Sequence, residues 1–269
     1  MSNVSISTNK LCIGYSVQNT VYRVQTDLDF ALMQGELVCM LGPNGCGKST
    51  LLRTLAGLQP ALSGKYSLTG EAGLTVERSN SDNGLTAQRS KSVALVLTER
   101  LSMENTTVHD VVAMGRYPYT SFLGGLTETD EQIIAESLRQ VGFEITGSRD
   151  HEITTTMFNA HSDGEKQRIL IAKALAQQTP IILLDEPTAH LDLPHRILIL
   201  RLLRQLAHEQ GKTILISTHE LDLALALSDR ILLMTPHKGI QLDTADNLRK
   251  NNAFTSAFGM DIFNPFGEE

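Results

Sequence analysis

The sequence predicts an α/β fold in which a largely parallel β-sheet is buried between helices. Short uninterrupted apolar runs, typical of strands covered on both faces, lie at residues 37–41, 181–184 and 213–217. Segments with helical periodicity lie among them, at residues 49–58, 164–176 and 196–208. Strands that alternate with helices in this way favour a parallel sheet.

Two regions depart from this alternation. Alternating apolar positions around residues 4–13 and 21–30 predict an antiparallel β-subdomain near the N-terminus, and residues 93–97 predict a further strand. From about 103 to 160 the pattern is helical, with Thr127 and Asp130 spaced as a capping box before a helix. We therefore expect a single domain over residues 1–269. Its expected parts are the core with the β-subdomain at 1–97 and 165–243, the inserted helical subdomain at 98–164 and a short C-terminal tail at 244–269.

Composition and charge narrow the class of protein. With 41% hydrophobic and 20% charged residues, the chain of 269 residues has a globular composition. Its formal net charge of -7, without a Lys/Arg-rich run, argues against a nucleic-acid partner. Cys12, Cys39 and Cys46 lack metal-ligand spacing and are expected to be reduced thiols in a cytosolic compartment. No apolar run has the length of a membrane span, so we expect any membrane role to depend on a partner.

A glycine-rich turn, GPNGCGKS at residues 42–49, joins an apolar strand to a helix and matches the phosphate-loop pattern GxxxxGK[ST]. Glycines there let the backbone wrap closely around phosphates, with amide N–H groups turned inward. Lys48 is expected to reach the β- and γ-phosphates, and the Ser49 hydroxyl to bind Mg²⁺. A glycine turn that spells the motif by chance is the alternative. The expected ATP-binding residues of this loop are Gly42, Pro43, Asn44, Gly45, Cys46, Gly47, Lys48, Ser49 and Thr50.

A second element of phosphate chemistry follows the apolar run 181–184, where Asp185 and Glu186 end a buried strand. Carboxylates are rarely buried unless they are paired or bound to a metal. Asp185 is expected to hold Mg²⁺, directly or through water, and Glu186 to orient or deprotonate the attacking water. The alternative is a strand end that exposes two acids to solvent, which is common where no phosphate loop is present.

Residues 161–168, HSDGEKQR, resemble the signature sequence of ATP-binding cassette (ABC) ATPases, which usually reads LSGGQ. Ser162, 23 residues before Asp185, and Gly164 match it. Three neighbours differ from the usual form: His161, Asp163 and Glu165. The segment also spells a capping box, Ser162 with Glu165, and both interpretations can hold. The resemblance implies a P-loop NTPase (RecA-like) core with ATP and Mg²⁺ as ligands. It also implies a homodimer in which Ser162 and Gly164 point at the γ-phosphate held by the other subunit.

Further residues follow in the order of that family. Asp192 resembles the D-loop residue at the dimer interface, and Tyr15 resembles the aromatic residue that stacks on adenine. His219 lies after a buried strand, 33 residues beyond Glu186, and resembles the switch histidine that contacts the γ-phosphate and helps to position the water. Glu186 and His219 are therefore the expected catalytic residues. The resemblance covers residues 4–242.

The family normally has a glutamine after the strand that is expected at 93–97. Counting forward to Thr107 and Val108, which resemble a family landmark, puts Thr98 at that position, followed by Glu99. A threonine hydroxyl is a shorter ligand for Mg²⁺ or water, and Glu99 adds negative charge beside the phosphates unless Mg²⁺ offsets it. Thr98 is therefore a candidate metal ligand, and whether Thr98 or Glu99 replaces the glutamine stays open.

The run GRYPY at 115–119 resembles a sequence frequent in the ATPases of importers for iron-siderophores, haem and vitamin B12. Two aromatic residues and a proline in a loop form a compact knob suited to a partner's groove. Arg116, Tyr117 and Tyr119 are therefore expected to contact a separate transmembrane permease, and a loop packed on itself is the alternative. The implied setting is the cytoplasmic face of the inner membrane, with an extracytoplasmic substrate-binding protein as an indirect partner.

Three other classes are weaker fits to the sequence. Soluble ABC-family ATPases of DNA repair or translation usually have a coiled-coil insertion or two ATPase halves, and this sequence shows neither. A non-enzymatic nucleotide-binding module is expected to lose Glu186 or His219, and both are present. Exporters often fuse the spanning helices to the ATPase, and no such helices occur here. The sequence therefore predicts an ATP-hydrolysing importer subunit, with the soluble ATPase as the alternative.

Overall fold

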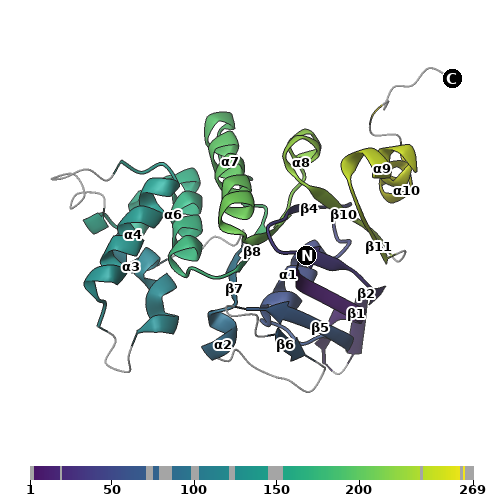
Figure 1. Ribbon diagram of the computed structural model, residues 1–269, viewed down its shortest axis with the longest axis horizontal. Coiled ribbons are helices and arrows are strands. Elements are labelled where there is room, and N and C mark those ends of the chain that lie inside the picture. Colours follow the sequence, from purple (N-terminus) through teal and green to yellow (C-terminus); the bar gives the residue numbers. More distant parts are fainter. Residues whose placement is uncertain are drawn as a thin grey trace.

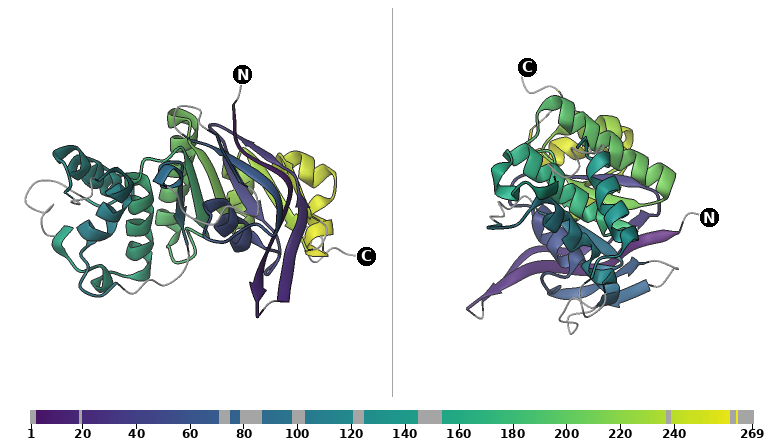
Figure 2. Two further views of the ribbon diagram at one scale, coloured as in Figure 1. Left: turned by 90° about the horizontal axis from the view of Figure 1, so that it is seen from below. Right: turned by 90° about the vertical axis from the view of Figure 1, so that its left-hand side faces the viewer.

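The computed structural model describes residues 3–18, 20–70, 75–78, 87–97, 103–120, 125–144, 154–236, 239–260 and 263. Within these ranges a mixed, mostly parallel sheet occupies the centre, a smaller antiparallel sheet lies on one side of it and a group of helices on the other (Figure 1; Figure 2). The α/β architecture with an N-terminal antiparallel β-subdomain and an inserted helical subdomain is confirmed.

The central sheet has the strand order β11-β10-β4-β9-β8-β7. Its strands are β4 (Leu37–Leu41), β7 (Val93–Val96), β8 (Ile181–Asp185), β9 (Thr213–Ser217), β10 (Arg230–Thr235) and β11 (Gly239–Asp243). All neighbours are parallel except β10 and β11. Every residue of β4, β8 and β9 is buried, which explains why the sequence shows continuous apolar runs there instead of alternation.

The antiparallel sheet runs β2-β1-β5-β6, and β3 also pairs with β1. Its strands are β1 (Val4–Val17), β2 (Thr20–Leu28), β3 (Ala31–Met33), β5 (Ser63–Thr69) and β6 (Thr75–Arg78). Helix α1 (Lys48–Ala56) lies between the two sheets. Its buried Leu51, Leu52 and Leu55 share one apolar cluster with strands of both, which fixes the start of α1 against the β-subdomain.

The remaining helices pack either together in the helical subdomain or against the central sheet. They are α2 (Ala87–Ser90), α3 (Val108–Ala113), η2 (Met114–Tyr119), α4 (Glu128–Gln140), η4 (Phe158–Ala160), α6 (Asp163–Ala176), α7 (Leu193–Gln210), α8 (Leu221–Leu227), α9 (Ala245–Lys250) and α10 (Ala253–Phe258). Within the expected tail, α9 and α10 bury Leu248 and Phe254 in a cluster with Ile231 and Leu233 of β10.

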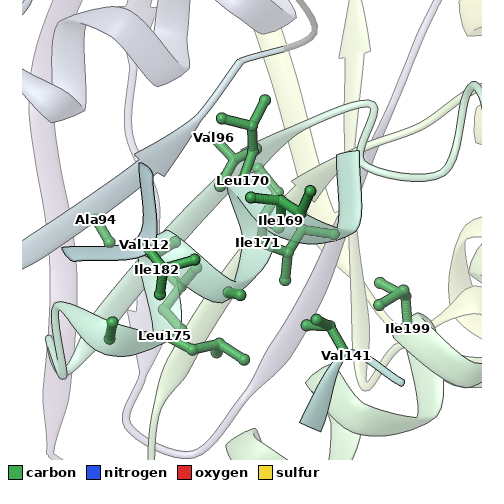
Figure 3. Close-up of a cluster of buried hydrophobic side chains, with 14 of the residues drawn as sticks. Ala94, Val96, Val112, Val141, Ile169, Leu170, Ile171, Leu175, Ile182 and Ile199 are labelled. Carbon is green, nitrogen blue, oxygen red and sulfur yellow. The ribbon is translucent and has the colours of Figure 1, made fainter. Parts of the chain in front are cut away.

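Helix α6 joins the helical subdomain to the central sheet. Its Ile169 and Leu175 pack in one buried cluster with Val112 of α3, Ile182 of β8 and Ile199 of α7 (Figure 3). The expected subdomain boundary at 164/165 thus falls in the first turn of α6, which begins at Asp163. Because α6 packs on both sides, it links the helical subdomain mechanically to the central sheet.

Candidate nucleotide-binding site

The phosphate loop follows β4 and leads directly into α1. A Cβ atom at Gly42 would lie 2.5 Å from the carbonyl oxygen of Met234, and one at Gly47, where φ is 108°, would lie 2.7 Å from Val24. Only glycine fits both places, because φ at Gly47 is left-handed and the neighbouring atoms leave no room. The loop is therefore held close to β2 and β10, as a backbone cradle for phosphate requires.

Lys48 is the first residue of α1 and is only 7% exposed. Its Nζ donates hydrogen bonds to the carbonyl oxygens of Gly42 at 2.8 Å and Pro43 at 3.3 Å, so the ammonium group lies inside the curve of the loop. The first turn of α1 has no acidic residue. Amide N–H groups, the helix dipole and a buried cation thus act together in favour of an anion.

Strand topology brings the distant motifs to the same edge as this loop. Strands β4, β9 and β8 are parallel neighbours, so the segments that follow Leu41, Ser217 and Asp185 all leave the sheet at its carboxyl edge. Ser217 Oγ donates to Asp185 Oδ1 at 2.5 Å, and the Glu186 amide donates to the Ser217 carbonyl oxygen at 3.1 Å. The first bond orients the Asp185 carboxylate, and the second fixes the backbone that carries Glu186.

Glu186 and His219 meet at this edge. His219 Nε2 contacts Glu186 Oε1, and about a third of the Glu186 side chain and nearly half of the His219 side chain are exposed. Glu186 has a φ of 46°, a conformation that non-glycine residues seldom adopt and that often marks a functional position. The contact places both expected catalytic side chains where they can reach one water molecule.

The oxygen donors fit Mg²⁺ in type. The Ser49 hydroxyl stands in the first turn of α1, and Asp185 is buried with one oxygen held by Ser217. Mg²⁺ usually binds one or two protein oxygens and takes its other ligands from phosphates and water. These residues therefore suit a metal that arrives with the nucleotide. The third expected ligand, Thr98, lies outside the described residues, as does Glu99.

The signature segment forms the start of α6. Ser162 is its N-cap and makes the full capping box with Glu165, as the sequence predicts. Gly164 lies against the chain before α7, since a Cβ there would be 3.1 Å from the carbonyl oxygen of His190. Asp192 caps α7, accepting from the His195 amide at 3.1 Å, and keeps its carboxylate exposed. The segments expected to face a second subunit therefore lie side by side.

Tyr15 stands on β1 with half of its surface exposed, and its ring stacks on Tyr22 of β2 at a centroid distance of 5.5 Å. Tyr22 was absent from the sequence expectations. The register of the β1–β2 hairpin is the feature that could have revealed it, because this register puts Tyr22 directly opposite Tyr15 and on the same face of the sheet. The expected adenine platform is thus an aromatic pair.

The GRYPY residues form most of the short helix η2 and not the expected loop, and they are only partly exposed. Arg116 is 5% exposed, and its Nε donates to Asp130 at 2.7 Å and its Nη1 to the Ala176 carbonyl oxygen at 2.8 Å. Tyr119 lies against the Arg116 guanidinium and donates to the Gln177 carbonyl oxygen at 3.0 Å, whereas Tyr117 is 60% exposed. Arg116 and Tyr119 therefore brace the end of α6, and Tyr117 alone of the three expected permease contacts projects freely.

Comparison with known proteins places this geometry in a family. Residues 25–189 match the model of the ABC transporter family. The chain is 37% identical to the achromobactin transport ATP-binding protein of Dickeya dadantii, over 85% of this chain and 78% of that protein. It is 34% identical to the iron(3+)-hydroxamate import ATP-binding protein of Bacillus subtilis, over 96% and 88%.

Among solved structures, the fold is similar to that of a chain from a transporter assigned to the metal-chelate type and captured in an inward-facing conformation. The TM-score is 0.76 at 28% identity, and the match covers 96% of this chain and 90% of that chain. In the ranges that the structure describes, no helix combines the length and apolar character needed to cross a membrane. The chain belongs to the ABC transporter family and is an ATP-binding subunit of that family.

Proposed function

We propose that this chain hydrolyses ATP with Mg²⁺ and powers import through a separate permease. The observation that supports this best is the meeting of Glu186, His219 and the buried Asp185 at the sheet edge that also carries the phosphate loop. Lys48 and the loop amides bind the phosphates, and Ser49 and Asp185 hold the metal. Glu186 takes the proton of the attacking water, and His219 holds the Glu186 carboxylate in position relative to the γ-phosphate.

Two copies of the chain complete each site. The N-terminus of α6, with Ser162 and Gly164, carries a helix dipole and stands on the helical subdomain, whereas the phosphate loop lies between β4 and α1, against the β-subdomain. A head-to-tail homodimer brings this helix start to the γ-phosphate held by the partner and puts the exposed Asp192 at the interface. Closure on ATP then pulls the helical subdomain, because α6 is packed within it.

The permease is proposed to dock where the helical subdomain meets the core. A largely apolar cavity of about 350 Å³ lies there between β7, the end of α1 and α6, with Leu58, Leu95 and Leu170 among its lining residues. Tyr119 donates to the backbone of Gln177, which lines this cavity, and η2 also carries the exposed Tyr117. The proposed location is therefore the cytoplasmic face of the inner membrane, where the permease holds the chain, and the proposed indirect partner is a substrate-binding protein on the other side.

The proposed cargo is an iron chelate, a siderophore or haem, or cobalamin. The GRYPY resemblance and the achromobactin and iron(3+)-hydroxamate relatives support this choice. The cargo is not expected to touch this subunit, so no residue of the chain selects it directly. The second candidate function is a soluble ATPase in a process other than transport.

The test is co-purification with candidate permeases, followed by ATP-driven uptake of ferric hydroxamate, ferric carboxylate siderophore, haem or cobalamin into proteoliposomes. Glu186→Gln is the matched inactive control. We expect uptake of one chelate class that requires ATP and is lost in the control. ATP hydrolysis by a chain that associates with no permease and drives no uptake would favour the soluble ATPase.

A further inference from the structure

Gln25 is a buried polar side chain in a mostly exposed strand. The first four residues of β2 are exposed and Val24 is half-buried, but Gln25 is 2% exposed. The register between β1 and β2 shifts on both sides of the pair Ile13–Gln25. Such irregularities re-aim a side chain, and here they accompany the turn of Gln25 toward the phosphate loop.

The Gln25 amide joins two segments that are far apart in the chain. Its Nε2 donates to the Cys46 carbonyl oxygen at 3.0 Å and to the Thr235 carbonyl oxygen, 210 residues away, at 2.9 Å. One NH₂ group therefore ties the phosphate loop to the end of β10. Its Oε1 is buried without a hydrogen-bond partner within the described ranges. A buried amide oxygen of this kind costs stability, so the two donated bonds are what Gln25 contributes at this place.

Peptide geometry gives the first of these bonds a consequence for phosphate binding. The described peptide bonds are all trans, and in a planar trans peptide the carbonyl oxygen and the following N–H point in opposite directions. By holding the Cys46 carbonyl toward β2, Gln25 turns the N–H of Gly47 away from β2, toward the inner side of the loop. Gly47 has no side chain to resist rotation of this peptide, so an outside bond is needed to fix it.

We propose that Gln25 is a positioning residue for nucleotide binding, which aims the Gly47 N–H at the phosphates and holds the loop against β10. It touches no substrate itself. The proposal rests on nucleotide binding by the family's phosphate loop and not on the proposed import. Because it is tested with ADP, its failure is separate from any failure of hydrolysis or transport.

The first test compares Gln25→Leu with the wild type by titration calorimetry with ADP and Mg²⁺. Loss of one ordered loop amide weakens ADP and ATP binding alike, by about tenfold, while kcat at saturating ATP stays within about twofold. The matched control is Thr8→Val. Thr8 is a buried polar residue of the same sheet whose hydroxyl accepts from the Phe30 amide at 3.0 Å, away from the loop. We expect it to lower thermal stability without changing ADP affinity.

The second test uses Gln25→Glu and a pH series. Ionised, the new carboxylate has no donor and faces two carbonyl oxygens, whereas its protonated form donates one hydrogen bond. Burial raises the pKa of such an acid, so ionisation falls in the range that can be assayed. The ratio of its ADP dissociation constant to that of the wild type is expected to rise about tenfold between pH 5.5 and pH 8.5.

The same ratio for Gln25→Leu is expected to stay flat with pH. Unchanged ADP affinity in Gln25→Leu, an equal loss of affinity in Thr8→Val, or a flat ratio for Gln25→Glu overturns the proposal. If Gln25→Leu fails to fold, the pH dependence of ADP binding by Gln25→Glu is the deciding measurement. A residue with a purely structural role would change the stability of the protein but not the pH profile of ADP binding.

Discussion

The imidazole of His219 contacts the carboxylate of Glu186 across two neighbouring strand ends. The two residues follow β9 and β8, and the bond from Ser217 Oγ to Asp185 locks these strand ends together. Glu186 keeps a left-handed backbone there, with its amide bonded to Ser217. The sheet itself therefore orients the pair that we propose to be catalytic.

Replacement of Glu186 by Gln is expected to separate binding from chemistry. The proposed phosphate and metal contacts come from Lys48, Ser49 and Asp185, so we expect ATP still to bind, while loss of the proposed base lowers kcat by about 10²- to 10⁴-fold. The change also removes a negative charge near each γ-phosphate and favours a closed dimer. Phosphate release and size-exclusion chromatography in ATP, with ADP as control, measure both effects. Rapid turnover in this variant would remove Glu186 from the catalytic role.

Tyr15→Ala is expected to weaken ATP binding, because it removes the exposed ring that the family resemblance places on adenine. Stacking of this kind is worth about 1 kcal/mol, or roughly a fivefold loss of affinity. Tyr15→Phe keeps the ring and serves as the control. Tyr22→Ala, which removes the ring stacked on Tyr15, is expected to give a smaller loss. Equal affinities of Tyr15→Ala and Tyr15→Phe would count against adenine stacking.

Tyr117→Ala is expected to weaken association with the permease and to leave basal ATP affinity within about twofold. The reason is its 60% exposure on η2, the short helix whose Tyr119 is bonded to Gln177 in the lining of the apolar cavity. An interface aromatic of this type typically contributes at least about 1 kcal/mol. Tyr119→Ala is a poor test of docking, since the hydroxyl and ring of Tyr119 brace α6. Pull-down against detergent-solubilised permease measures the effect, and undiminished binding contradicts the assignment.

Stability is expected to fall when Asp130 is replaced by Asn, and by an amount that depends on pH. Hydrogen bonds from the Thr127 amide and hydroxyl, and then from Arg116, lower the pKa of Asp130 from 3.8 to about 2. A carboxyl group whose pKa is lower in the folded than in the unfolded state contributes its full stabilisation above about pH 4. This contribution is lost as the pH falls toward 2. We expect a cost of about 2 kcal/mol at pH 7 that shrinks toward pH 3, measured by urea unfolding.

Glu136→Gln is the matched control for this series. Glu136 stands on the same helix in an ion pair with Arg139 in which about half of each side chain is exposed, and such pairs contribute little. An equal cost for both variants, or a cost at Asp130 that does not change with pH, contradicts the argument.

Cys46 is expected to react slowly with maleimides in the folded protein. Its side chain is 2% exposed, and burial raises the pKa of the thiol above 9.0 despite the opposing effect of Lys48, so little thiolate is present at pH 7. The rate is expected to increase with pH, and protein labelled at Cys46 is expected to lose nucleotide binding because the adduct disrupts the loop. Mass spectrometry of native and guanidinium-unfolded samples measures the rates. Equal rates in both states would show that the thiol is accessible.

The sequence by itself determined the features that local spacing encodes. The phosphate loop lies between a strand and a helix, the apolar runs are buried strands, and both predicted capping boxes, at Thr127 and Ser162, form. These signals are strong because a cap, a turn or a buried strand depends on residues only a few positions apart. The two acids at the end of a buried strand pointed to Glu186 and the family resemblance to His219, and the fold brings these side chains into contact.

Only the tertiary structure decided which side chains are exposed for contact with a partner and which are used in internal hydrogen bonds. Of the residues in the GRYPY run, Tyr117 is exposed, whereas Arg116 is buried. The Arg116 guanidinium donates its hydrogen bonds to Asp130 and to the end of α6. Gln25 gave no local signal at all. Its role follows from a bond to Thr235 across 210 residues, and such pairings depend on how the two sheets pack around α1, which no periodicity along the chain records.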